Sequence, residues 1–171
     1  MKHIHFMPDS RYAKDFIVFV NSNFNMKDHY FVIYKNDARY VQKEKNVLWV
    51  RDLWEQRSKF ERKLLAANKV YFHYMTDNCE KLILRYCLFT KQILTWRIWE
   101  SDLYKLLPIK RYDEETVKIG YSNPTLQKNI WSYLRRIAFY RLDVVHVTKE
   151  YFNDLQSNFK IRACCNPVLV P

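Results

Sequence analysis

The sequence predicts a doubly wound, mostly parallel Rossmann-like α/β fold. Short runs of apolar, β-branched and aromatic residues alternate with segments of about 10 to 15 residues that have helical spacing. The expected strands are apolar without alternation, which is typical of parallel strands covered on both faces. Strands that alternate with helices along the chain imply right-handed crossovers in one sheet, so residues 1–171 are expected to form a single domain.

The first half of the chain contains the clearest signals. Its expected strands cover residues 3–7, 30–34, 46–50 and 69–75. After the first strand, "PDS" turns the chain into a helix with an apolar stripe that starts at Tyr12 and ends at Phe24. Asp52 and Glu55 have capping-box spacing, so a helix that buries Leu64 is expected to begin there.

The second half repeats the pattern. Its expected strands cover residues 92–99, 143–147 and 160–164. Helices are expected after Thr76 or Asp77, over residues 125–142, and after Thr148. Residues 104–124 form the longest irregular stretch and are interpreted as a functional loop.

Charge and glycine content limit the possible functions. The formal charge of +11 favours polyanionic neighbours such as nucleic acid, an acidic membrane surface or phosphorylated ligands, although a solvated basic face explains it equally well. The chain has a single glycine, which excludes a phosphate loop or a dinucleotide-binding motif built from clustered glycines.

Cysteine and histidine positions indicate neither a metal site nor a redox motif. The cysteines have no zinc or CxxC spacing and are interpreted as reduced core thiols: Cys79, Cys87, Cys164 and Cys165. The histidines in the expected strands, His3, His5, His73 and His146, are interpreted as core or surface imidazoles. No cofactor is therefore expected.

The N-terminus has too short an apolar run for a signal peptide, and no apolar segment is long enough to span a membrane, so a cytoplasmic location is expected.

Polar residues gather where the expected strands end, which is the edge where open α/β sheets bind ligands. They are Asp9, Ser10, Thr76, Asp77, Glu100, Ser101, Asp102, Tyr104, Thr148 and Glu150. Helix N-termini select the same residue types, so Thr76, Asp77 and Thr148 are interpreted as caps. Only one of Asp9 and Ser10 can be a cap, which leaves the other to face a ligand.

The expected helix over residues 125–142 has two different sides. The predicted core stripe is Leu126, Ile130, Leu134 and Ile137, and a second face carries Lys128, Trp131, Arg135 and Phe139. A basic face with aromatic residues suits anionic lipid headgroups. The alternative is that Trp131 and Phe139 also pack inward.

Three stretches resemble the bacterial TDP-N-acetylfucosamine:lipid II N-acetylfucosaminyltransferases, a glycosyltransferase family of the GT-B type. "HIHFMPDSRYAKDFIVFVNSNF" is similar to the family's opening strand, turn and helix, and "WRIWESDLY" resembles its "W-x-I-W-G-G-D-L-Y". "VVHVTKEYFNDLQSNF" is like the strand and helix that close its first domain. Glu100 and Ser101 replace the family's glycines, whereas Asp102 and Tyr104 are retained.

The resemblance implies the acceptor-side half of an enzyme with two Rossmann-like domains. A second domain, absent from this chain, would bind the dTDP-sugar, so the chain is expected to be a fragment, an isolated domain or a truncated gene product with little activity alone. Its partner would be a lipid-linked saccharide at the cytoplasmic face of the inner membrane. The general base would be Asp9 or, as second choice, Asp102.

Residues of the ligand edge, of the loop over residues 104–124 and of the helix over residues 125–142 receive binding roles in the same hypothesis. The expected acceptor-binding residues are Ser10, Asp77, Glu100, Ser101 and Tyr104. The expected phosphate or membrane contacts are Lys105, Lys110, Arg111, Trp131 and Arg135. Two other classes remain open: a basic nucleic-acid-binding module and a non-catalytic interaction domain. The positive charges are interleaved with acids and no known nucleic-acid motif occurs, which argues against nucleic acid as the partner.

Overall fold

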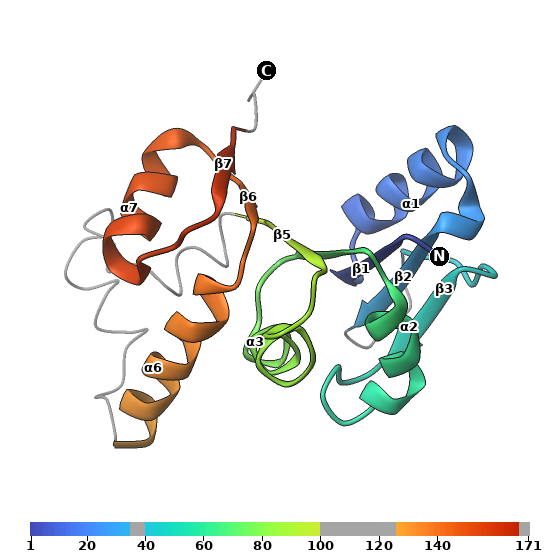
Figure 1. The fold of residues 1–171 in the computed structure, drawn as a ribbon. Helices are drawn as coiled ribbons and strands as arrows, with labels where there is room; N and C mark the ends of the chain where they lie inside the picture. The colour runs from blue at the N-terminus through green and yellow to red at the C-terminus, as the bar shows by residue number, and fades with distance from the viewer. Residues whose placement is uncertain (35–39, 100–125, 168–171) are drawn as a thin grey trace, which may run out of the picture.

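A parallel sheet of seven strands forms the centre of the fold, in the order β3-β2-β1-β4-β5-β6-β7 (Figure 1). The computed structural model describes residues 1–34, 40–99 and 126–167, with the backbone alone in residues 126–129. The strands are β1 (His3–Pro8), β2 (His29–Tyr34), β3 (Val47–Val50), β4 (Lys69–His73), β5 (Ile93–Arg97), β6 (Val144–His146) and β7 (Cys164–Asn166).

Helices cover both faces of this sheet. They are α1 (Arg11–Asn23), α2 (Glu61–Ala66), α3 (Asp77–Leu82), α6 (Leu126–Tyr140) and α7 (Lys149–Phe159). Two short 3-10 helices, η1 (Met26–Asp28) and η2 (Arg57–Lys59), and the π-helical segment η3 (Ile83–Cys87), which continues α3, complete the set. The chain moves from β1 to β2 and β3 on one side, and then returns to add β4 to β7 on the other side of β1. The predicted doubly wound, parallel α/β fold is confirmed.

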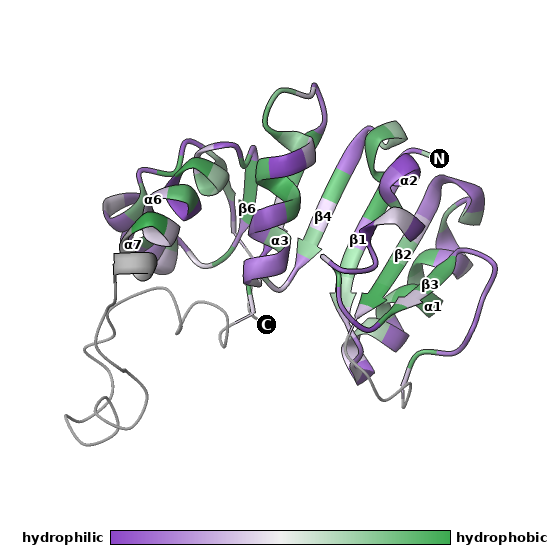
Figure 2. Cartoon of the chain, turned by 90° about the horizontal axis from the view of Figure 1, so that it is seen from below, coloured by the Kyte–Doolittle hydropathy of each residue, from purple (hydrophilic) through white to green (hydrophobic). Residues whose placement is uncertain are grey.

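The two faces of the sheet have separate hydrophobic cores. Ile17 of α1 packs with Met7 and Phe31 on one face. On the other face, α2, α3, α6 and α7 pack over residues such as Phe72 and Trp96. Figure 2 shows α1 and α2 on opposite sides of β1 and β2. Because both faces are covered, β1 and β2 are buried at every position after their first residue, which explains the continuous apolar run of β2 in the sequence.

The prediction that a helix begins at Asp52 is wrong. One oxygen of the Asp52 carboxylate accepts the backbone N–H groups of Trp54, at 2.7 Å, and Glu55, at 2.8 Å, so it closes a turn. The α-helix α2 begins only at Glu61. Aspartate stabilises isolated turns and helix N-termini through the same type of bond, and the local spacing therefore does not distinguish the two.

The predicted core stripe of α6 is wrong at Ile130. Ile130 is 61% exposed, whereas Phe139 is fully buried against Trp96 of β5, with 5.1 Å between the ring centroids. Phe139 also contacts Phe159 of α7. For Phe139, the inward-packing alternative is therefore correct.

The last strand begins later than predicted, at Cys164, because Ile161 and Ala163 pack into the core from a non-strand segment.

All four cysteines are free, and Cys79 and Cys87 are buried as expected. Cys164 is exposed, so its interpretation as a core thiol is wrong. None of the helices in the described part of the chain is long and apolar enough to cross a membrane.

Candidate functional site

The winding of the sheet reverses between β1 and β4, which pair in parallel at its centre. Open α/β sheets bind ligands at this reversal, beyond the carboxyl ends of the strands. Asp9 and Ser10 follow β1 there, and Tyr74 to Asp77 follow β4. We treat this edge as the candidate site and call it the switch-point edge.

Asp9 and Ser10 have different roles. The Ser10 hydroxyl accepts the backbone N–H of Ala13 at 3.0 Å, so Ser10 is the N-cap of α1. The Asp9 carboxylate accepts the backbone N–H of Val41 at 3.2 Å, and its own N–H donates to the carbonyl of Tyr34 at 2.9 Å. Asp9 therefore ties the segment after β2 to the end of β1, and its half-buried carboxylate lies at the switch-point edge.

Tyr74 gives the edge a strained backbone. Its φ of 112° lies in a region that favours glycine, and such a residue costs on the order of 1–3 kcal/mol. The hydroxyl of Tyr34 donates to the Tyr74 carbonyl at 3.0 Å and helps to hold this conformation. Sequence reasoning missed Tyr74, because its residue type carries no signal for positive φ.

Thr76 and Thr148 both precede helices, but only one makes a capping bond. The Thr76 hydroxyl accepts the backbone N–H of Cys79 at 3.3 Å, which confirms the capping interpretation. Thr148 stands at the N-cap position of α7 without a side-chain cap bond. Its hydroxyl is buried and has no partner within the described residues.

Asp77 and Arg135 meet at an ion-paired cluster between α3 and α6. Arg135 binds the exposed Asp77 carboxylate at 2.9 Å and the buried Glu80 carboxylate at 2.6 Å. Glu80 is 1% exposed, and burial raises its pKa to about 7, against the opposing effect of Arg135. Trp131 lies beside the cluster with its ring nitrogen buried, and the ammonium of Lys81 lies 5.7 Å from its ring centroid.

The ion pairs of this cluster give Arg135 a structural role. Its guanidinium is engaged by two carboxylates of α3, which holds α6 against α3. A membrane contact of Arg135 or Trp131 stays a prediction. Sequence reasoning missed Glu80; its position inside the helix expected after Thr76 or Asp77 was the only available signal.

A chain of hydrogen-bonded histidines lies beneath α1. His5 Nε2 is 3.1 Å from Nδ1 of His29, and His5 Nδ1 is 3.2 Å from Nε2 of His73. Burial lowers the pKa of His5 well below 6.5 and, together with Arg97, lowers that of His73 to about 3. These imidazoles are neutral at pH 7. The series of hydrogen-bonded histidines ends at His73, the last residue of β4.

Aromatic residues extend the edge toward β5. The Tyr12 ring of α1 packs edge-on against Trp99, with 5.1 Å between centroids, and the guanidinium carbon of Arg97 lies 5.4 Å from the Tyr12 ring. Seven further residues predicted for the site lie outside the described residues: Glu100, Ser101, Asp102, Tyr104, Lys105, Lys110 and Arg111.

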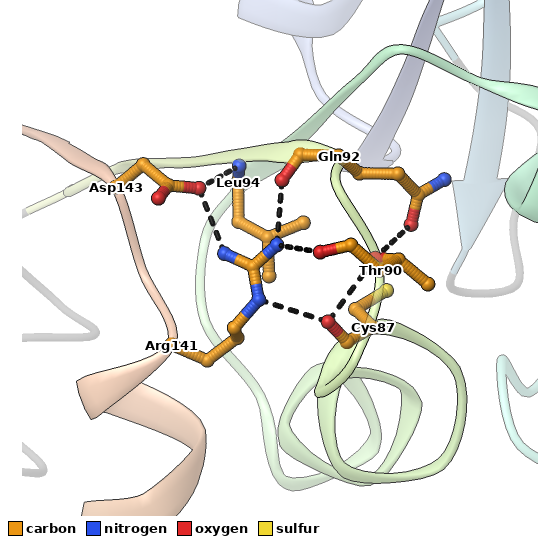
Figure 3. Close-up of polar contacts among 6 residues, drawn as sticks. All are labelled: Cys87, Thr90, Gln92, Leu94, Arg141 and Asp143. Carbon is orange, nitrogen blue, oxygen red and sulfur yellow. Dashed lines mark hydrogen bonds and ion pairs between the residues drawn. The ribbon is translucent and has the colours of Figure 1, made fainter.

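A hollow of about 630 Å³ lies at the opposite edge, between the end of α6 and the starts of β6 and β7. Arg141 lines it, but this side chain is committed to the scaffold (Figure 3). It donates to the carbonyls of Cys87, Thr90 and Gln92 at 2.6–2.9 Å and pairs with Asp143 at 2.8 Å. The hollow therefore offers no free charged group from Arg141, and the switch-point edge remains the better candidate.

No group of three or more His, Cys, Asp or Glu side chains within residues 1–34, 40–99 and 126–167 is arranged to hold a metal ion. A scan of protein-family models finds none that matches the chain, and a search of curated proteins also finds no match.

Proposed function

We propose that this chain is the acceptor-binding domain of a glycosyltransferase, which transfers N-acetylfucosamine from a dTDP-sugar to a lipid-linked saccharide in bacterial surface-polysaccharide synthesis. The observation that carries the proposal is the place of Asp9, directly after β1 where the winding of the sheet reverses. An inverting transfer needs a general base within hydrogen-bond reach of the acceptor hydroxyl. A carboxylate at this edge suits that role.

The positions of the three resembling stretches support the same function. They include β1 with α1, the end of β5, and β6 with α7. Because all strands are parallel, the carboxyl ends of β1, β5 and β6 meet at one edge of the sheet. A lipid-linked saccharide bound along this edge would contact all three. The donor sugar would come from a second domain, and the basic surface would favour the anionic cytoplasmic face of the inner membrane.

The proposal is tested by measuring acceptor binding and sugar transfer with the natural protein that contains this chain, a lipid-linked saccharide in detergent micelles, and dTDP-N-acetylfucosamine. Asp9→Asn is compared with Asp15→Asn, which changes an exposed carboxylate of α1. We expect Asp9→Asn to lower kcat about 100-fold or more, as loss of a general base does. The acceptor Kd should stay within about threefold, because most of the binding contacts remain. Asp15→Asn should change neither value.

Two outcomes would overturn these assignments. Unchanged transfer by Asp9→Asn would exclude Asp9 as the base. Absence of acceptor binding would exclude the acceptor-binding function. If the protein instead bound a random oligonucleotide with micromolar affinity that fell steeply with salt, the charge of +11 would indicate a nucleic-acid-binding module.

A further inference from the structure

Three nitrogen-rich side chains form a row beside the switch-point edge. His73, Arg97 and His146 are the last residues of β4, β5 and β6. The strand register pairs His73 with Arg97, and Arg97 with His146. Neighbouring strands lie about 4.8 Å apart, so the row extends across about 10 Å of the sheet. We call these three residues the basic row.

The basic row faces the same side of the sheet as α1. Residues at the same register of parallel strands point to the same face. The guanidinium of Arg97 lies over the ring of Tyr12, which belongs to α1, and His73 bonds to His5 beneath α1. The described helices on the β5 and β6 half, α3, α6 and α7, pack into the core of the opposite face. Both His146 and Arg97 are partly accessible.

Among the described residues, Arg97 carries a positive charge that no carboxylate neutralises. Within the residues that the structure describes, it forms no ion pair with an acidic side chain. Burial lowers the pKa of both His73 and His146, and the charge of Arg97 lowers both further. The row therefore consists of one guanidinium between two neutral imidazoles. An anion above the row would meet the guanidinium charge and an N–H group from either imidazole.

Unsatisfied polar atoms at the same place form a second, independent observation. His73 is 2% exposed, and its Nδ1 atom has no partner within the described residues, because the ring is held with Nε2 toward His5. The Tyr12 hydroxyl, also buried, has no partner in the described part of the chain either. A buried polar atom left without a bond costs on the order of 1–3 kcal/mol. A ligand rich in oxygen atoms would satisfy both groups.

From these contacts we infer that the basic row binds a phosphate group at the ends of β4, β5 and β6. Arginine matches phosphate because its planar fork donates two parallel hydrogen bonds. The identity of the ligand rests on the proposed function, in which the phosphates belong to the lipid-linked acceptor. Phosphate binding itself does not depend on that function.

The inference is tested by titrating the protein with pyrophosphate and with inorganic phosphate, using calorimetry and the ring-proton NMR signals of the histidines. We expect one pyrophosphate site whose occupation shifts the signals of His73 and His146. Arg97→Gln should weaken binding about tenfold or more, the loss expected for a charge-assisted contact. The control, Arg85→Gln, removes an exposed arginine of η3 and should change the Kd less than about twofold, because rim charges contribute little.

Equal weakening in the Arg97 and Arg85 variants would overturn the inference, since binding would then follow overall charge. So would unchanged histidine signals at saturating pyrophosphate. If Arg97→Gln does not fold, His146→Gln serves as the second variant and should weaken binding about threefold, as loss of one neutral hydrogen bond does. A Kd unchanged in His146→Gln would then reject the row.

Two further comparisons separate the source of the phosphate and the proposed function. Phosphatidylglycerol vesicles that bind only with Arg97 intact, together with much weaker binding of free pyrophosphate, would identify a lipid headgroup as the ligand. Acceptor binding and transfer that survive Arg97→Gln would show that the acceptor's phosphates do not bind at the basic row, and would leave the proposed function standing. Pyrophosphate binding at the row without acceptor binding would reject the function and leave the site.

Discussion

Acidification should destabilise this fold through its two fully buried histidines. His5 and His73 have pKa values lowered by burial, whereas in the unfolded chain each takes up a proton below about pH 6.5. The unfolded state therefore binds more protons than the native state, and stability is lost as pH falls below that value. Each histidine that stays neutral in the native state lowers the free energy of unfolding by about 1.4 kcal/mol for each pH unit below about 6.5, or by about 2 kcal/mol at pH 5. The two histidines together lower it by about 4 kcal/mol at pH 5.

Glu80 has the opposite effect on stability as the pH falls, so a variant without its carboxyl group is needed to measure the effect of the histidines. Its pKa is raised to about 7 by burial, so the native state keeps a proton that the unfolded state releases above about pH 4.5. Acidification to pH 5 therefore stabilises the native state through Glu80 by about 2 to 3 kcal/mol. In Glu80→Gln this compensation is absent, while Arg135 keeps its bond to Asp77.

The assay is urea unfolding followed by tryptophan fluorescence at pH 7, 6 and 5. We expect the free energy of unfolding to fall by about 4 kcal/mol in Glu80→Gln over this range, and by about 1 to 2 kcal/mol in the unchanged protein. Adding His73→Gln should halve the slope of the Glu80→Gln variant. If the stability of Glu80→Gln does not change between pH 7 and 5, the buried histidines take up protons in the native state and do not have lowered pKa values.

Three further changes should each lower stability. Arg135→Ala leaves the Glu80 carboxylate buried without its partner and should cost about 3 kcal/mol at pH 8, but clearly less at pH 5, where Glu80 is protonated; equal losses would contradict the raised pKa. Tyr34→Phe removes the bond to the strained Tyr74 carbonyl and should cost about 1–2 kcal/mol in urea unfolding; an unchanged midpoint would show that this bond does not hold Tyr74. Arg141→Lys cannot reproduce the fork that reaches three carbonyls and should cost about 2–4 kcal/mol, with a lowered Tm as the readout; a loss below 1 kcal/mol, about one net hydrogen bond, would argue against this role.

The sheet was predictable because burial on both faces leaves an unbroken apolar run. Tyr30 to Tyr34 in β2 are all buried, and their letters alone indicate a strand. Helix positions were less predictable. Asp52 closes a turn with the same bond that would open a helix. In α6, the burial of Phe139 and the exposure of Ile130 depend on contacts with β5 and α7 that the helix sequence does not contain.

The candidate site was predictable in location but not in detail. The rule for open α/β sheets placed Asp9 and Ser10 at the ligand edge, and the structure shows that Ser10 is the cap. The histidine chain joins residues that are 24 and 68 positions apart. His73 therefore looked like an isolated core residue in the sequence, although it bonds to His5 and pairs in register with Arg97.

The order of residues was sufficient to predict the fold class, because apolar periodicity follows directly from which faces of a strand or helix are buried. It also determined that Asp9 follows a strand end. The groups that share an environment became evident only from the three-dimensional packing: Arg135 with Glu80, and His73 with Arg97. The reason is physical. Strand pairing and helix packing bring together residues from distant parts of the chain, and burial at those contacts sets their pKa values and the hydrogen bonds that they can make.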